Sequence, residues 1–576
     1  MPCEDRADPH PTSGARTDAN ATEGRVPTMV SNPLARARQH ALGDLPRRSA
    51  HRHGGKLAIV DGDTRFSFAE LEAVVDRTAA AIDAAGLVKG DRLALLSHNC
   101  WQFVVLSFAT ARRGVVLVPI NFMLNPDEIA YVLDHSGAIA FVAEGALAGT
   151  ADKAIAASVG AVAIKLSIVG VGAGATAGAG DRGGAGATAG AGDRVGAGWA
   201  DLATWTGYLG PRPEEVLVAD DDPIRLMYTS GTESRPKGAI LTSRALLWQY
   251  ASCAIDGEMT GDDVEVHALP LYHCAQLDCF LNVDVYTGAT SILLPAPRPA
   301  AILRAIEDNK ATKFFAPPTV WISLLRSPEF ESTDLSTLRK GYYGASPMPV
   351  EVLHELRERL PQVRFWNFYG QTEMAPLATI LKPDEQLPRA GSAGRPAINV
   401  ETIVVNAEDA DDDRPLPAGT IGEIVHRSPH ATLGYYHDDE KTDDAFRNGW
   451  FHSGDLGVFD EDGYLTVVDR KKDMIKTGGE NVASREVEEA LYQHEGVAEV
   501  AVFGIDHPHW IEAVTAVIVP KSTALDPDEV IVFGKTVLAS FKAPKYVVVV
   551  DALPKNPSGK ILKRELRERY GHLGRN

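Results

Sequence analysis

Cysteines are few in this sequence and show no pattern. Five occur among 576 residues, an odd number, and no two form a C-x-x-C pair. This argues against a disulfide framework and structural zinc, and it favours a reduced, cytoplasmic protein. A run of about 18 apolar residues is also missing, so no membrane span is predicted. The N-terminus is polar and proline-rich and lacks the hydrophobic core of a signal peptide.

Basic residues are outnumbered by acidic ones, 57 to 77, which gives a formal net charge of -20. This charge argues against non-specific nucleic-acid binding and against attraction to an anionic membrane surface. An anionic substrate must therefore be met by a local basic pocket. The chain is too long for one hydrophobic core, so we expect at least two domains.

Two stretches have compositions that do not favour a packed core. Residues 1–28 are rich in Asp, Arg, Pro, Thr and Gly, and we expect a disordered tail there. Within residues 170–198 a glycine–alanine segment occurs twice, at 172–182 and 184–194. Such a segment has little to bury and a large ordering entropy, so we expect a flexible insertion without a catalytic part.

The remaining sequence predicts an α/β protein with two domains. Apolar strands at residues 92–96 and 115–119 flank an apolar helix at 101–111, which indicates a parallel sheet. This alternation predicts a large N-terminal domain at residues 29–470. A helix from Ser484 and three further strands predict a small α+β domain at residues 473–576. The charge-rich residues 470–473 are a candidate linker between the two domains.

A glycine–hydroxyl loop, Thr229-Ser230-Gly231-Thr232, lies between two apolar runs and is followed by Lys237. The pattern predicts a strand, a turn and a second strand. Backbone N–H groups, hydroxyls and a lysine can together wrap a polyphosphate. The loop is not a Walker A loop, because Pro236 and Gly238 replace the glycine and the Ser/Thr of that motif. A solvated surface turn is the alternative.

His273 follows a predicted strand, in a stretch whose side chains can line a cleft. For a lone residue of this kind, a packed histidine is the favoured interpretation. Cys274 and Cys279 nearby do not have the spacing of zinc ligands. The acidic residues 408–414 do not match a calcium loop, and a solvated hairpin turn is expected there.

Six motifs in a fixed order make the chain resemble the adenylate-forming superfamily of acyl-CoA synthetases, luciferases and peptide-synthetase adenylation domains. Each motif alone is weak, but the set is specific and the resemblance covers about residues 30–570. The motifs are residues 229–238, Tyr343-Gly344-Ala345-Ser346, Tyr369-Gly370-Gln371-Thr372-Glu373, Ser453-Gly454-Asp455, Asp469-Arg470-Lys471-Lys472-Asp473 and Pro557-Ser558-Gly559-Lys560.

The resemblance implies a large N-terminal domain, a small mobile C-terminal domain, and roles for named residues. The nucleotide-binding residues that it implies are Thr229, Ser230, Gly231, Thr232 and Lys237 at the β- and γ-phosphates, Gly344, Ala345, Ser346, Tyr369 and Gly370 at adenine, and Asp455 and Arg470 at the ribose. The catalytic residues that it implies are Thr372, Glu373 as the Mg²⁺ ligand, His273 and Lys560. Lys560 would bridge the attacking carboxylate and the α-phosphate.

For the second half-reaction the resemblance implies that the small domain turns about Lys472. Gly478 and Gly479 would then face the pocket and let the pantetheine arm of CoA pass close to the backbone. By analogy the acid pocket is expected at the helix of Trp248, residues 273–276, residues 342–343 and residues 367–368. One departure from the family pattern is Glu233 in the phosphate loop, which we expect to point outward, away from the triphosphate.

The implied function is an ATP-dependent acid:CoA ligase that acts on a fatty or aryl acid through an acyl-adenylate. ATP, Mg²⁺ and CoA are the expected cofactors, and we expect a monomer or homodimer with neither nucleic-acid nor integral-membrane partners. Two other functions stay open. One is the activation of nitrite for diazotising an aromatic amine, and the other is a non-catalytic nucleotide-binding homologue.

Overall fold

The computed structural model describes residues 33–160, 162–169, 198–229, 235–346, 348–409, 412–478, 480–521, 525–556 and 559–575. The chain separates into two units, residues 1–39 and 40–576. In the first unit the described part is helix α1 (Pro33–Arg38) and Gln39. The predicted tail at residues 1–28, and the predicted insertion at 170–198 except for Gly198, lie outside the described residues. All that follows concerns the second unit.

A seven-stranded sheet carries the strand that leads into the phosphate loop. Strands β3 and β4 are parallel and are joined by helix α4 (Trp101–Arg113), which confirms the predicted strand–helix–strand unit. The sheet order is β7 (Ala200–Asp201), β6 (Ile164–Ile168), β5 (Ala140–Glu144), β3 (Arg92–Leu96), β4 (Val116–Ile120), β8 (Pro223–Thr229) and β9 (Lys237–Thr242). Strand β9 pairs antiparallel with β8, so the loop between them joins two neighbouring strands.

A nine-stranded sheet carries two of the motifs, at residues 343–346 and 369–373. Strands β10 to β14 and strand β1 are joined in parallel pairs, and both edges end in antiparallel strands. The order is β16 (Arg395–Pro396), β15 (Leu377–Leu381), β14 (Arg364–Gly370), β13 (Lys340–Gly344), β12 (Lys313–Phe315), β10 (Val264–His267), β11 (Thr290–Leu293), β1 (Leu57–Asp61) and β2 (Thr64–Ser67).

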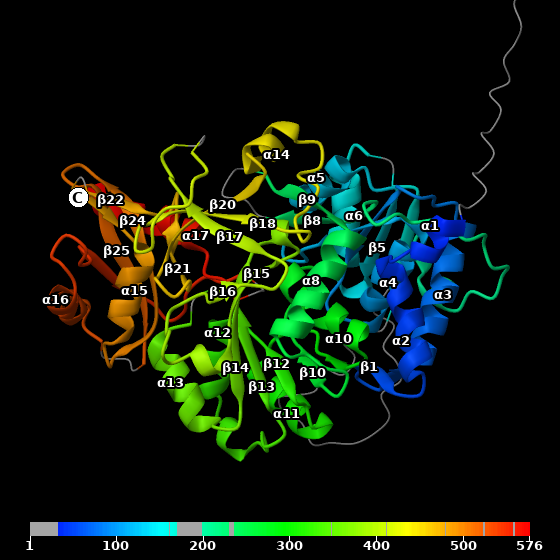
Figure 1. Cartoon of the computed structure of the whole chain (residues 1–576), viewed down its shortest axis with the longest axis horizontal. Coiled ribbons are helices and arrows are strands. Elements are labelled where there is room, and N and C mark those ends of the chain that lie inside the picture. The colour runs from blue at the N-terminus through cyan, green and yellow to red at the C-terminus, as the bar shows by residue number, and fades with distance from the viewer. Residues whose placement is uncertain are drawn as a thin grey trace, which may run out of the picture. The chain divides into compact units, whose positions relative to one another are not determined.

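Helices pack around these two sheets, and one hydrophobic cluster extends over both of them (Figure 1). Helix α3 begins with the capping box predicted at Ser67: the hydroxyl of Ser67 accepts from the Glu70 N–H, and the Glu70 carboxylate accepts from the Ser67 N–H. The helices are α2 (Leu45–His53), α3 (Phe68–Ala84), α5 (Pro126–Ser136), α6 (Ala148–Ala157), α7 (Ala203–Thr206), α8 (Ser243–Asp256), α9 (Cys274–Gln276), α10 (Asn282–Thr287), α11 (Pro299–Asn309), α12 (Pro318–Leu325) and α13 (Val350–Arg359).

A five-stranded antiparallel sheet follows. Its strands are β17 (Glu401–Val405), β18 (Gly422–Arg427), β19 (Phe446–Arg447), β20 (Trp450–Phe459) and β21 (Leu465–Arg470), with helix α14 (Asp439–Ala445) between β18 and β19. Strands β17 and β18 form the hairpin expected on either side of the acidic turn. In the β20–β21 pair, Asp455 lies opposite Arg470, so two motif residues far apart in sequence become neighbours.

The last sheet confirms the predicted small α+β domain (Figure 1, orange to red). Val487 and Leu491, the predicted apolar face of α15, are fully buried in its core. Its elements are β22 (Ile475–Thr477), β23 (Glu480–Val482), α15 (Ser484–Tyr492), β24 (Val497–His507), β25 (Ile511–Pro520), α16 (Pro527–Val537), β26 (Tyr546–Val549) and α17 (Lys563–Tyr570). Within the described part of the chain, no helix has the length and apolar character needed to cross a bilayer.

Candidate active site

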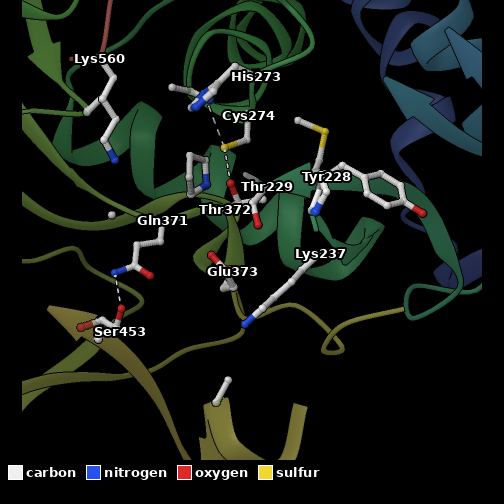
Figure 2. A pocket seen from close by; sticks show the side chains of 18 of the residues that line it. Tyr228, Thr229, Lys237, His273, Cys274, Gln371, Thr372, Glu373, Ser453 and Lys560 are labelled. Carbon is white, nitrogen blue, oxygen red and sulfur yellow. Dashed lines mark hydrogen bonds between the residues drawn. The ribbon is translucent and has the colours of Figure 1, made fainter. Parts of the chain in front are cut away.

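A cavity of about 640 Å³ lies where strands of three sheets end. In parallel α/β sheets the carboxyl ends of the strands are where ligands bind. Described residues of all six motifs line this cavity, and Lys560 enters it from the C-terminal segment (Figure 2). The motif residues in the wall are Thr229, Pro236, Lys237, Gly344, Ala345, Tyr369, Gly370, Gln371, Thr372, Glu373, Ser453, Gly454, Arg470, Lys471, Lys472 and Lys560.

The two ends of the phosphate loop lie side by side. Thr229 ends β8, Lys237 begins β9, and the two residues are opposite each other in the antiparallel pair. The ammonium of Lys237 is 5.2 Å from the centre of the Tyr435 ring, a cation–π contact. Ser230, Gly231, Thr232 and Glu233 lie outside the described residues, so the predictions made for them stay predictions.

The turn after β14 presents three polar side chains to the cavity. The hydroxyl of Thr372 is 3.1 Å from the sulfur of Cys274, and the amide of Gln371 donates to the Ser453 carbonyl at 3.0 Å (Figure 2). One carboxylate oxygen of Glu373 accepts from the Tyr435 hydroxyl at 2.8 Å. A carboxylate has further lone pairs and is a hard oxygen donor, so Glu373 fits a Mg²⁺ ligand.

Close backbone approach explains two of the motif glycines. A Cβ atom on Gly344 would be 2.3 Å from the Phe368 carbonyl oxygen, and one on Gly370 would be 1.8 Å from that of Pro376. Neither position accepts a side chain without moving backbone. Ala345, which follows Gly344, has a φ of 63° and lines the cavity. Ser346 is described but does not belong to the cavity wall.

Asp455 is buried beneath the cavity and is not part of its wall. One of its carboxylate oxygens accepts from the Tyr369 hydroxyl at 2.8 Å and from the Gln371 amide at 2.9 Å. The other oxygen is 3.3 Å from Nε of Arg470. The structure therefore brings together three residues that the sequence assigned to the nucleoside, and the aspartate orients the other two.

Lys560 enters the cavity from the C-terminal segment. Its backbone N–H donates to the Asn556 side chain at 2.8 Å, and the preceding Gly559 carbonyl accepts from the Thr319 hydroxyl of α12 at 3.0 Å. Burial lowers the pKa of Lys560 to about 8, and the positive charge of Arg470 adds to the effect. Because the lowered pKa means that the charged form of Lys560 is disfavoured in the cavity, an anion that enters the cavity stabilises that form.

His273 caps the short helix α9, and its Nδ1 accepts from the Ala275 N–H at 3.2 Å. Burial lowers the pKa of His273 to about 4, and the charge of Lys560 lowers it further. The imidazole is therefore neutral near pH 7 and does not compete with Lys560 for an anionic carboxylate. This places His273 in the cavity wall, as predicted.

Of the two glycines predicted to face CoA, the structure describes Gly478. Gly478 has a φ of 61°, and its N–H donates to the Trp510 carbonyl at 2.8 Å; it is not in the cavity wall. Gly479 lies outside the described residues. Lys472, the predicted hinge residue, does line the cavity, and burial together with Arg470 lowers its pKa.

The residues expected by analogy to form an acid pocket lie only partly in the cavity wall: His273, Cys274, Ala275 and Phe368 line it. Trp248 is 47% exposed, and Gln276 is buried but turned away from the cavity. The sequence analysis missed Phe280 and Phe315, which line the cavity together with Phe368. Their sequence signal is weak, because a phenylalanine in an apolar run is equally expected in a core. The expected residues Tyr342, Tyr343 and Asn367 are also absent from the described wall.

Comparisons with known proteins agree with this geometry. Residues 46–436 match the model of the AMP-binding enzyme family, and residues 486–560 match that of the AMP-binding enzyme C-terminal domain. A feruloyl-CoA synthase of Amycolatopsis is 35% identical over 93% of this chain and 100% of its own length. A long-chain-fatty-acid–CoA ligase of Escherichia coli is 32% identical over 94% of this chain and 97% of its own.

A solved structure with the same fold is the o-succinylbenzoate CoA synthetase of Bacillus subtilis in complex with its acyl-adenylate intermediate. It is 26% identical, covers 92% of this chain and 99% of its own, and superposes with a TM-score of 0.76. The family models together span most of the chain, and the six predicted motifs lie within or between them. The chain thus belongs to the family of AMP-binding, adenylate-forming enzymes.

Proposed function

We propose that this protein is an ATP-dependent acid:CoA ligase. It joins a carboxylic acid to the α-phosphate of ATP, releases pyrophosphate, and then transfers the acyl group to CoA with loss of AMP. ATP, Mg²⁺ and CoA are its cofactors. The observation that carries the proposal is the convergence of Lys237, Glu373, Arg470 and Lys560, which belong to four separate segments, on one cavity.

In the first half-reaction the side chains divide the charge of the nucleotide among them. Thr229 and Lys237 hold the β- and γ-phosphates, and Tyr369, Asp455 and Arg470 hold the nucleoside. Mg²⁺, held by Glu373, neutralises part of the triphosphate charge when bound. Lys560 stabilises the negative charge that develops between the acid and the α-phosphate, where a positioned cation has its largest effect.

In the second half-reaction the C-terminal domain turns. We propose a body at residues 29–470, a hinge at 471–472 around Lys472, and a cap at 473–576. Support comes from the sheets, because β21 ends at Arg470 and the C-terminal sheet begins at Ile475. The turn withdraws Lys560 and brings residues 478–479 to the cavity, where CoA displaces AMP.

The acid is proposed to be a flat aryl acid. Phe280 stacks on Phe315 at 4.2 Å between ring centres with an interplanar angle of 12°, and on Phe368 at 5.6 Å with 25°. These rings give one part of the cavity wall flat apolar faces, which suit contact with an aromatic ring. The feruloyl-CoA synthase relative supports this choice. Because another relative is a fatty-acid ligase, an aryl acid and a fatty acid must be compared directly as substrates.

Acid–CoA ligases among the relatives favour this function over nitrite activation and over a non-catalytic homologue. We also propose a reduced, cytoplasmic setting, supported by the free thiols of Cys100, Cys253, Cys274 and Cys279. The oligomeric state, monomer or homodimer, stays a prediction.

Replacing Lys560 by alanine should abolish adenylation and spare thioester formation. We expect ferulate-dependent pyrophosphate release to fall about 100-fold or more, as when a positioned electrostatic group is removed from a transition state. Conversion of supplied feruloyl-AMP and CoA to thioester should persist. Lys555→Ala is the matched control, because Lys555 lies on the same segment, pairs with Glu499 at 2.6 Å and does not line the cavity. Equal loss in both variants would contradict the role.

The pH dependence of kcat/KM for ferulate should have a basic limb near pH 8. Lys560 acts as a cation, and its pKa is lowered to about 8, so the free enzyme loses the charge as the pH rises through that value. Lys560→Arg keeps the charge at all these pH values, so its limb should move upward by more than one pH unit. A limb that stays in place in Lys560→Arg would assign it to another group.

Shortening the aromatic wall should broaden the acid specificity. In Phe280→Leu we expect the ratio of kcat/KM for palmitate over ferulate to rise roughly tenfold, the scale on which hydrophobic pockets discriminate. Phe314→Leu is the control, because Phe314 is equally buried on β12 but packs on Trp321 and does not line the cavity. An unchanged ratio in Phe280→Leu would show that another residue limits chain length.

A further inference from the structure

A cluster of charged side chains lies entirely buried beneath the segment that carries His273. Glu265 and His267 are on β10, Asp284 is on α10 and Lys313 is on β12, and all four are inaccessible to solvent. Ligand atoms of Glu265, His267 and Asp284 lie within 4.8 Å of one another. The ammonium of Lys313 contacts both carboxylates, so the cluster contains its own cation and has no need of a metal ion.

The hydrogen bonds of His267 determine which of its nitrogens carries the proton. Nδ1 is 2.7 Å from the amide nitrogen of Gln276, and Nε2 is 3.0 Å from a carboxylate oxygen of Asp284. An amide nitrogen only donates, so Nδ1 accepts and the proton lies on Nε2, which donates to Asp284. Burial lowers the pKa of His267, which agrees with a neutral ring.

Gln276 transmits this orientation to the backbone that leads into the cavity wall. Because its amide nitrogen faces His267, its oxygen faces the N–H of Leu269 and accepts from it at 3.3 Å. From the other side Asn99 donates to the Leu269 carbonyl at 2.8 Å and accepts from the Leu271 N–H at 2.8 Å. Two buried amides thus hold both backbone groups of Leu269, four residues before His273.

We propose that Gln276 is a positioning residue for acid activation: clamped by His267, it fixes the segment from Leu269 to His273, whose last two residues line the cavity. Tyr272 and His273 at the end of this segment line the cavity that Lys560 enters. Gln276 touches neither substrate and acts through the backbone. This inference rests on the proposed function.

The first test compares two substrates in Gln276→Leu. With ferulate as the probe acid we expect kcat/KM to fall about tenfold or more, because small displacements in a reacting geometry are costly. The KM for ATP should stay within about twofold. Gln386→Leu is the matched control: Gln386 is an equally buried glutamine that binds Tyr343 and the Leu381 carbonyl instead. Thermal midpoints of both variants show what loss of a buried amide does to stability alone.

The second test uses Gln276→Glu, which keeps the volume of the side chain. With one proton on the carboxyl or on Nδ1 of His267, both hydrogen bonds can be retained; without it, the carboxylate faces a lone pair. The titratable groups of this network are Glu265, the neutral His267, Asp284 and the Lys313 cation. Burial near Asp284 raises the pKa of a new carboxyl group, so the proton is held at low pH and lost on raising the pH.

Gln276→Glu should therefore approach wild-type kcat/KM for ferulate at pH 6 and fall relative to wild type as the pH rises. Gln276→Leu should stay low across the same range. The proposal is overturned if Gln276→Leu keeps the wild-type kcat/KM for ferulate. It is also overturned if Gln276→Leu and Gln386→Leu change kcat/KM for ferulate and KM for ATP to the same extent, or if the two Gln276 variants have the same pH profile. A wild-type enzyme that releases no pyrophosphate with ferulate or any other acid would instead overturn the proposed function.

Discussion

The concentration of positive charge in one cavity is the constraint on which the site depends. Lys237, Arg470, Lys472 and Lys560 all line it, although the chain carries a net charge of -20. Burial and mutual repulsion lower the pKa values of Lys472 and Lys560, which means that their charged forms lack full compensation. A polyanion such as a nucleotide triphosphate supplies that compensation, so ligand charge and cavity charge are matched locally, independent of the global field.

Local sequence patterns predicted the elements, and distance along the chain limited the rest. The unit of β3, α4 and β4 was predictable because its periodicity and its parallel pairing lie within one short stretch. The pairing of β1 with β11 was not predictable, because the paired residues Ile59 and Ser291 are far apart along the chain. No periodicity within either strand specifies which distant strand lies beside it.

The same division applies to the site. Thr229, Glu373 and Arg470 were predictable because they belong to motifs whose order and spacing resemble those of the adenylate-forming family; taken singly, only the phosphate loop of Thr229 favoured a functional role. Phe280 and Phe315 were not, since their sequence context is that of any buried aromatic. Trp248 was expected in the acid pocket, but a helix exposes one face, and the sequence alone did not show that Trp248 lies on it.

The buried ion network under the His273 segment raises an energetic question. Hydrophobic residues of similar size would often make such a site as stable or more stable, since the desolvation of buried charges is costly. Apolar packing is not directional, however, and cannot decide which way the amide of Gln276 points. A neutral histidine held between Asp284 and Gln276 does decide it, because a proton on one nitrogen excludes a donor role for the other. What the network contributes is therefore direction, transmitted to the backbone N–H of Leu269, four residues before His273 in the cavity wall.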